Sequence, residues 1–157
     1  MEGLAALMGG KKPFVQQLQR IFDEGLFDPA NEPDIAYPYL FSRFRGEEKR
    51  TWETVDAILE RHYRNAPDGI PGNDDTGTMS AWAVFSMLGL YPDCPGEPYY
   101  TLTRPTFPKA EIRLGDGSVL TIVKQAKVRG AALDGKRVRA YRLPHETVAG
   151  THLIEWK

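Results

Sequence analysis

The sequence lacks three features that would assign it to a class of protein at once. Its 157 residues include a single cysteine, Cys94, which excludes an internal disulfide and a cysteine-based metal cluster. Lys and Arg number 20 against 21 Asp and Glu, so net charge gives no reason to expect nucleic acid or an anionic membrane as a partner. No apolar run approaches the ~20 residues of a membrane-spanning helix. The length is enough for one domain with a core, or for two small packed units.

The same absences leave the compartment open. A chain with one cysteine is compatible with the periplasm as well as with the cytoplasm. The amino-terminal segment over residues 1–8 is too short and too acidic for the pattern of a signal peptide.

The apolar pattern divides the chain into a helical part and a part made of strands. Helical spacing predicts helices over Leu4–Met8, from Pro13 to Gly25, over Glu47–Tyr63 and over Thr78–Leu88. Leu26–Tyr39 is predicted to be a loop because three prolines interrupt it. From Lys109 onward the period becomes two, and strands are expected over 109–114, 119–123, 128–133, 136–141 and 151–156. We therefore expect an α+β fold, with a helical segment over 1–91 and an extended connector with an antiparallel sheet over 92–157.

The most unusual stretch runs from Ile70 to Trp82. Gly72 and Gly77 flank Asn73, Asp74 and Asp75, and these glycines allow a sharp turn that presents the three polar side chains together. Thr78 is a candidate N-cap for the segment that follows. That segment is apolar on all sides, which predicts a fully buried helix. Acidic groups at the mouth of a buried helix are costly to keep unless a function uses them.

A second acidic loop, Asn31-Glu32-Pro33-Asp34, also joins two predicted helices. In a barrel of paired helices, loops at one rim line a common pocket, and this arrangement would bring Glu32 and Asp75 together. Paired carboxylates across a pocket perform glycoside hydrolysis, and hard oxygen donors of this kind also suit calcium. The residues alone leave a simpler alternative open, because Asp and Asn beside Gly often only form turns.

Other candidate residues are better explained by structure. Trp82 and Phe85 fit the core, and His62 suits the negative end of a helix. His145 and His152 have no partners at zinc-ligand spacing. Lys124–Arg142 is basic in the way that the solvated face of a sheet is basic.

The stretch Gly72-Asn73-Asp74-Asp75-Thr76-Gly77-Thr78-Met79-Ser80-Ala81-Trp82, with Leu88-Gly89-Leu90-Tyr91-Pro92 after it, resembles glycoside hydrolase family 92. These enzymes are calcium-dependent, inverting exo-α-mannosidases. Asn31-Glu32-Pro33, the Pro105–Ile112 run, His145-Glu146 and Gly150-Thr151-His152-Leu153 resemble the same family in the same order.

The resemblance implies a role for each residue of the two loops. Asp75 corresponds to the general base, and Asn73 to a helper position that is often acidic in the family. Glu32 corresponds to a ligand of the calcium that holds O2 and O3 of the sugar, while Asn31 and Asp74 are expected to bind substrate. The expected fold is part of an (α/α) barrel followed by a small antiparallel sheet.

The family's general acid lies beside a Trp-Gln-Tyr motif, which this sequence does not contain. The resemblance therefore implies the carboxy-terminal portion of an α-mannosidase of the α-1,2 type. Such a portion would act on a mannoside or N-glycan and would be inactive alone. It also implies a periplasmic or extracellular location, and either self-association or a missing amino-terminal part. The competing hypothesis is a non-catalytic carbohydrate-binding or subunit-association module.

Overall fold

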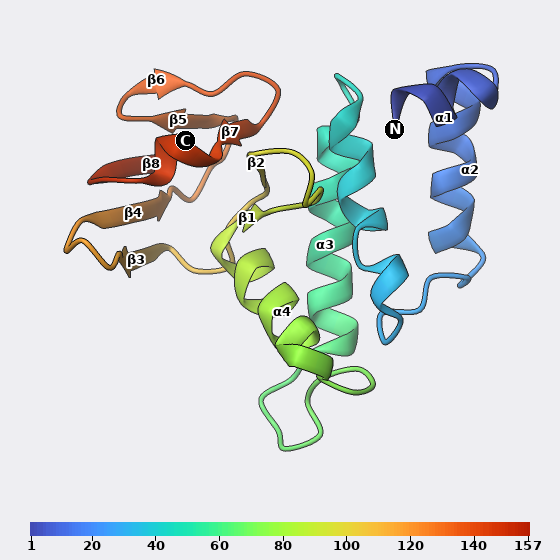
Figure 1. The fold of residues 1–157 in the computed structure, drawn as a ribbon, viewed down its shortest axis with the longest axis horizontal. Coiled ribbons are helices and arrows are strands. Elements are labelled where there is room, and N and C mark those ends of the chain that lie inside the picture. The colour runs from blue at the N-terminus through green and yellow to red at the C-terminus, as the bar shows by residue number, and fades with distance from the viewer. The chain divides into compact units, whose positions relative to one another are not determined.

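A computed structural model describes residues 1–157, and in it the chain forms two compact units, Met1–Ala81 and Trp82–Lys157 (Figure 1). Helices fill the first unit, and all the strands lie in the second, so the α+β order is confirmed. The division that composition predicts between residues 91 and 92 stays a prediction. None of the helices combines the length and the hydropathy that a membrane crossing needs.

The first unit contains α1 (Glu2–Leu7), α2 (Lys11–Asp23) and α3 (Glu48–His62). Its core is an aromatic and aliphatic cluster from α1, α2 and the segment before α3: Ala5, Phe14, Val15, Leu18, Leu40 and Phe41. Phe14 and Phe44 lie with ring centroids 5.1 Å apart, and Phe22 lies 5.9 Å from Phe41. Helical spacing therefore matches the buried face of α2, which holds Phe14, Val15 and Leu18, whereas Leu4 and Leu7 of α1 are exposed.

The segment between α2 and α3 is more ordered than the predicted loop. It contains two 3₁₀ helices, η1 (Glu32–Asp34) and η2 (Tyr37–Arg43). Pro33 and Pro38 stand in their first turns, where the fixed φ of proline fits and its missing N–H costs nothing. The prolines predict a loop, whereas in the structure they begin short helices. η2 then buries Tyr39 and Phe41 completely.

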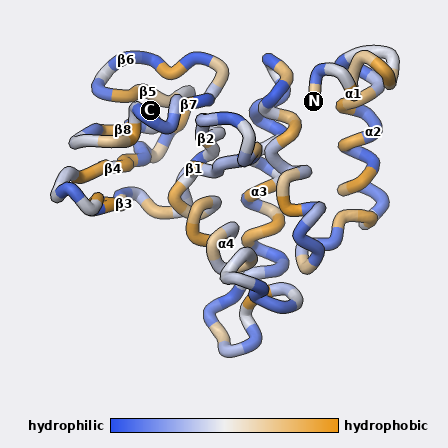
Figure 2. The backbone as a smooth tube through the Cα atoms, viewed as in Figure 1, coloured by the Kyte–Doolittle hydropathy of each residue, from blue (hydrophilic) through white to orange (hydrophobic).

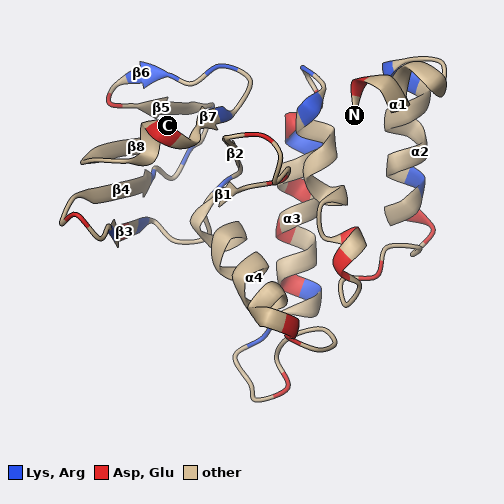
Figure 3. Cartoon of the chain, viewed as in Figure 1, with Lys and Arg blue, Asp and Glu red and all other residues tan.

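Helix α4 (Thr78–Leu88) has the predicted bounds but not the predicted burial. Met79, Trp82 and Ser86 are buried at helical spacing, whereas Ala81 is exposed and Val84 is 55% exposed. Figure 2 shows the helix in orange and pale colours, and Figure 3 shows no charged residue along it. The expectation of a helix buried all round is wrong for this chain, because one face of α4 has no partner in it.

The second unit holds two sheets. One has the order β1 (Leu90–Tyr91), β2 (Tyr99–Leu102) and β7 (Arg142–Pro144). The other has the order β3 (Lys109–Arg113), β4 (Val119–Lys124), β8 (His152–Trp156), β5 (Ala131–Leu133) and β6 (Lys136–Arg137). Between β7 and β8 lies the 3₁₀ helix η4 (His145–Val148). All ladders are antiparallel except β4 with β8, which run parallel, so the larger sheet is mixed.

Alternation along the strands builds the core of this sheet. Leu120 and Ile122 of β4 and Ile154 and Trp156 of β8 point inward and are at most 2% exposed. The ring of Tyr141 stacks on Trp156 at a centroid distance of 5.8 Å. Gly115-Asp116-Gly117 join β3 to β4 as a hairpin, which closes through a bond from Leu114 N to Ser118 O. The strands expected over 109–114 and 119–123 therefore form an antiparallel pair.

His152, the first residue of β8, lies between two hydrogen-bond acceptors. Its Nδ1 is 2.7 Å from Asp134 Oδ2, and its Nε2 is 3.1 Å from the Ala149 carbonyl oxygen. Both ring nitrogens can donate only in the protonated imidazolium. The bond to Asp134 accordingly raises the pKa of His152. The bond from Leu153 N, and then that from His152, lowers the pKa of Asp134.

These shifts predict a bell-shaped contribution to stability. A raised pKa in the folded state stabilises the protein fully below the ordinary histidine value of 6.5, and this contribution is lost as pH rises through the folded-state pKa. The lowered pKa of Asp134 stabilises above its ordinary 3.8, and this contribution is lost as pH falls through the folded-state pKa. Urea unfolding at pH 6 and pH 8.5 should show lower stability at the higher pH. The difference should shrink in His152→Asn and persist in His62→Asn, and an equal difference in both variants would contradict this assignment.

Candidate functional site

The first acidic loop is shaped by Asp34. This side chain is 9% exposed, and its carboxylate accepts bonds from Asp28 N at 3.0 Å and from Asn31 Nδ2 at 3.2 Å. The residues between these partners are thereby held in a tight turn, and η1 begins directly after Asn31. Glu32 points away from this network, because it is exposed and its carboxylate makes no hydrogen bond or ion pair.

The second acidic loop is anchored by Asp74. Its carboxylate accepts bonds from Ser80 N at 2.8 Å and from the Ser80 hydroxyl. The bond from the hydroxyl, then that from the amide, lowers the pKa of Asp74. A carboxylate on the first amides of a helix is a capping arrangement, favoured by the positive end of the helix dipole. The cap of α4 is therefore Asp74, and the expectation of Thr78 in that role is wrong.

Thr78 has a different partner. A 3₁₀ turn, η3 (Asp75–Gly77), separates Asp74 from α4, and the Thr78 hydroxyl donates to the Asp75 carbonyl oxygen at 2.7 Å. The Thr76 hydroxyl donates to the same oxygen at 2.7 Å. Thr76 has a φ of +52°, the left-handed region that costs a β-branched residue about 1–2 kcal/mol. The backbone around Asp75 is thus held in an unusual conformation.

Asp75 and Asn73 project from this loop without partners. Both are exposed, and neither side chain makes a hydrogen bond or ion pair. The acidic residues of the two loops therefore fall into two groups. Asp34 and Asp74 are engaged by the protein, whereas Glu32 and Asp75 are available to a ligand.

The two loops touch each other at Gly72 and Ala30. A Cβ atom at Gly72, whose φ is +63°, would lie 2.6 Å from the Ala30 Cβ and 3.3 Å from its Cα. Only a residue without a side chain fits this approach. Glu32 follows Ala30 by two residues, and Asp75 follows Gly72 by three. The loops expected to share a rim therefore lie side by side. The predicted roles of Asp75, Asn73, Asn31, Asp74 and Glu32 stay predictions.

The chain supplies few of the donors that the expected calcium ion would need. No group of three or more His, Cys, Asp or Glu side chains could hold a metal ion within the chain. Calcium takes 6–8 oxygen ligands, and the free carboxylate of Glu32 fits the chemistry of one of them. These residues therefore fit part of a calcium site and not a whole one.

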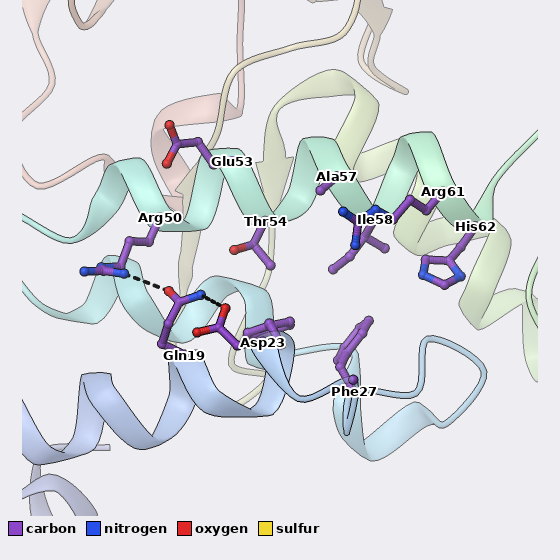
Figure 4. Close-up of a pocket in the computed structure, with 12 residues that line it drawn as sticks. Gln19, Asp23, Phe27, Arg50, Glu53, Thr54, Ala57, Ile58, Arg61 and His62 are labelled. Atoms are coloured by element: carbon purple, nitrogen blue, oxygen red, sulfur yellow. Dashed lines mark hydrogen bonds between the residues drawn. The ribbon is translucent and has the colours of Figure 1, made fainter.

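A groove of about 540 Å³ lies elsewhere in the first unit, between α2 and α3 (Figure 4). Gln19 spans its floor, accepting from Arg50 Nη1 at 2.8 Å and donating to Asp23 Oδ1 at 2.9 Å. None of the predicted site residues lines it. The groove is thus separate from the two acidic loops.

Sequence reasoning missed Ser80 and Thr76. Ser80 shares the first turn of α4 with Thr78, and a hydroxyl at the start of a largely apolar helix could have pointed to a partner in the acidic loop. The left-handed conformation of Thr76 had no signal, because threonine rarely adopts it.

Comparison with known proteins identifies related chains. The model of the glycosyl hydrolase family 92 catalytic domain matches residues 1–157. A family GH92 alpha-mannosidase from Bacteroides thetaiotaomicron is 25% identical, with a TM-score of 0.87 over 94% of this chain and 21% of its own. A family GH92 inverting mannosidase from the same species, also 25% identical, has a TM-score of 0.88 over 99% of this chain and 25% of its own.

A curated relative gives the same family context. An uncharacterised secreted glycosidase from Arthroderma benhamiae is 29% identical over 141 residues, which are 90% of this chain and 17% of that protein. The chain therefore spans only about a quarter or less of the relatives that it matches.

The contact between the loops predicts a difference between two glycine substitutions. Gly77→Ala should cost only the strain of a positive φ, about 1–2 kcal/mol, because nothing lies within 4 Å of its Cβ. Gly72→Ala should cost that strain and about 1–3 kcal/mol more from overpacking against Ala30. Urea unfolding measures both costs, and amide shifts of Asn31 and Glu32 should move only in Gly72→Ala. Equal losses of unfolding free energy in the two variants, with no amide shift changes at Asn31 and Glu32, would contradict the contact between Gly72 and Ala30.

Adjacent aspartates should also respond differently to removal of the carboxylate. Asp74→Ala should lower the thermal unfolding midpoint and loosen the first turn of α4, because Ser80 loses its acceptor. Asp75→Ala should leave the midpoint unchanged, since its carboxylate has no partner. Calorimetry measures the midpoint of both variants. A larger drop in Asp75→Ala than in Asp74→Ala would contradict the assignment of Asp74 as the engaged carboxylate and Asp75 as the free one.

Proposed function

Because the chain belongs to glycosyl hydrolase family 92, we propose that it takes part in the hydrolysis of α-mannosides, with Asp75 as the general base. The family match supports glycoside hydrolysis, and the α-mannosidases among the similar structures support the substrate. The proposed substrate is a mannoside or N-glycan with an α-1,2 linkage. The secreted relative supports a periplasmic or extracellular location.

The observation that carries the site is the contact of Gly72 with Ala30. It sets two loops side by side, and each of them presents one exposed carboxylate without a protein partner. Neighbouring free carboxylates are poorly explained as turn formers, because the turns are already closed by Asp34 and Asp74. A site for a polyhydroxylated ligand uses such groups as acceptors.

In the proposed reaction Asp75 removes a proton from the attacking water. The water oxygen bonds to the anomeric carbon as the glycosidic bond breaks, and the configuration inverts. Both oxygens of a carboxylate with no protein donor are available to that water at hydrogen-bond distance. Asn73 would orient the same water, since its amide is exposed and can donate or accept.

Glu32 is proposed as one carboxylate ligand of calcium. When bound, calcium would hold the O2 and O3 hydroxyls of the sugar and favour distortion of the ring toward the transition state. Asn31 would bind a sugar hydroxyl through its side-chain oxygen, because its Nδ2 already donates to Asp34. Asp74 has the weaker case as a substrate ligand, since Ser80 occupies its carboxylate.

The proposal assigns no general acid to residues 1–157. An inverting glycosidase needs an acid and a base on opposite sides of the bond. The chain alone is therefore expected to bind calcium and mannose but not to cleave an ordinary mannoside. A substrate whose leaving group needs no proton, such as α-mannosyl fluoride, would bypass the acid.

Two substrates and two variants test this proposal. With calcium, the chain should hydrolyse α-mannosyl fluoride, and proton NMR should detect β-mannose as the first product. Methyl α-mannobioside should stay intact. Asp75→Asn should lower kcat/KM for the fluoride by about 100-fold or more, the usual contribution of a general base. Glu32→Gln should weaken calcium binding in calorimetry. Asp116→Asn, in the β3–β4 turn, is the matched control and should change neither.

The outcomes separate the alternatives. Fluoride turnover that survives Asp75→Asn would overturn the role of Asp75. Cleavage of methyl α-mannobioside by the chain alone would show that it contains an acid. Mannose binding without any turnover would favour the non-catalytic carbohydrate-binding module instead.

A further inference from the structure

We propose that Thr76 and Thr78 are positioning residues that hold the peptide of Asp75 in place through its carbonyl oxygen. The inference rests on the proposed function of Asp75 and adds the means by which its carboxylate is aimed. It concerns the two hydroxyls that lie beside the candidate base and not the carboxylate itself.

The Asp75 carbonyl oxygen receives three donors. The hydroxyls of Thr76 and Thr78 each lie 2.7 Å from it, and the Thr78 N–H donates to it as η3 ends. A carbonyl oxygen inside an ordinary helix needs only the one backbone donor. The two hydroxyls are therefore additional restraints on the single residue that carries the candidate base.

The peptide on the other side of Asp75 is fixed as well. Asp74 precedes it directly, and the Asp74 carboxylate is bound by Ser80 in the first turn of α4. Asp75 thus lies between an anchored side chain and an anchored carbonyl. Its Cα–Cβ direction is set by these two anchors, while its carboxylate keeps no protein contact.

The conformation of Thr76 supports this reading. Its φ of +52° is left-handed and its ψ is +20°, although glycines occupy neighbouring left-handed positions at 72 and 77. A β-branched residue is strained there, and such strain persists only where the surroundings over-determine it. A glycine would relieve the strain but would bring no hydroxyl to the Asp75 carbonyl. The hydroxyl is the property that threonine adds at this position.

Rigid placement matters for a base because proton removal needs a defined distance to the attacking water. A misplacement of about 1 Å can cost a rate of the order of 100-fold. In an exposed loop with no side-chain contact at the carboxylate, that precision must come from the backbone. The threonine hydroxyls supply it through the backbone.

The test compares an isosteric and a conservative double variant. Thr76→Val with Thr78→Val keeps the branching and removes both hydroxyls, whereas Thr76→Ser with Thr78→Ser keeps both. Nitrogen-15 relaxation should show amide order parameters for Asp75–Gly77 falling from roughly 0.85 to below about 0.6 in the valine variant and staying high in the serine variant. Amides of the Asp116–Ser118 turn are the internal control and should not change.

Kinetics give a second readout that a purely structural role would not move. With α-mannosyl fluoride, the valine variant should lose about tenfold in kcat with KM unchanged, which corresponds to about 1.4 kcal/mol, and the serine variant should recover it. Unchanged order in the valine variant overturns the inference. Lost order with an unchanged kcat in an active chain also overturns it. Lost order in a chain without any turnover leaves the positioning intact and removes the proposed function instead.

Discussion

The close approach of Gly72 to Ala30 is the constraint on which the candidate site depends. A side chain at position 72 would meet Ala30 at 2.6 Å, so the two acidic loops can adjoin only while this residue has no Cβ. The loops lie more than 40 positions apart in sequence, and each leaves a different helix. Their adjacency is therefore a property of the packed unit Met1–Ala81 and not of either motif. Without it, Glu32 and Asp75 would be isolated surface carboxylates.

Within those loops the protein separates structural from available acidic groups. Asp34 and Asp74 satisfy backbone and side-chain donors that would otherwise need water, and they close the turns. Glu32 and Asp75 stand one or two positions away and take no part in that network. The proximity has a physical logic, because a free side chain is well placed only when its backbone is held by neighbours. The engaged aspartates and the threonine hydroxyls are those neighbours.

Much of the fold followed from periodicity, and much of the site did not. Helical spacing placed α2, α3 and α4, and alternation placed the β3–β4 hairpin with its turn at Asp116. The motif around Asp75 led to the family, which the match over residues 1–157 confirms. The parallel pairing of β4 with β8 was missed, because strand pairing over such a separation leaves no local signal. The prolines at the start of η1 and η2 did not predict these short helices, because proline suits a loop as well as a first helical turn.

The Asp74–Asp75 loop is acidic for a different reason from the one that the sequence suggests. Carboxylates beside a buried helix would be costly if they were desolvated, but both Asp74 and Asp75 are exposed and remain in water. The positive end of α4 makes Asp74 favourable at its position, so its presence requires no function. Asp75 has no such explanation, because it caps nothing and yet its backbone is restrained by two threonines, one of them strained. Restraint around a group that makes no contact of its own is hard to explain by stability alone, and it is what a base that must meet a water molecule requires.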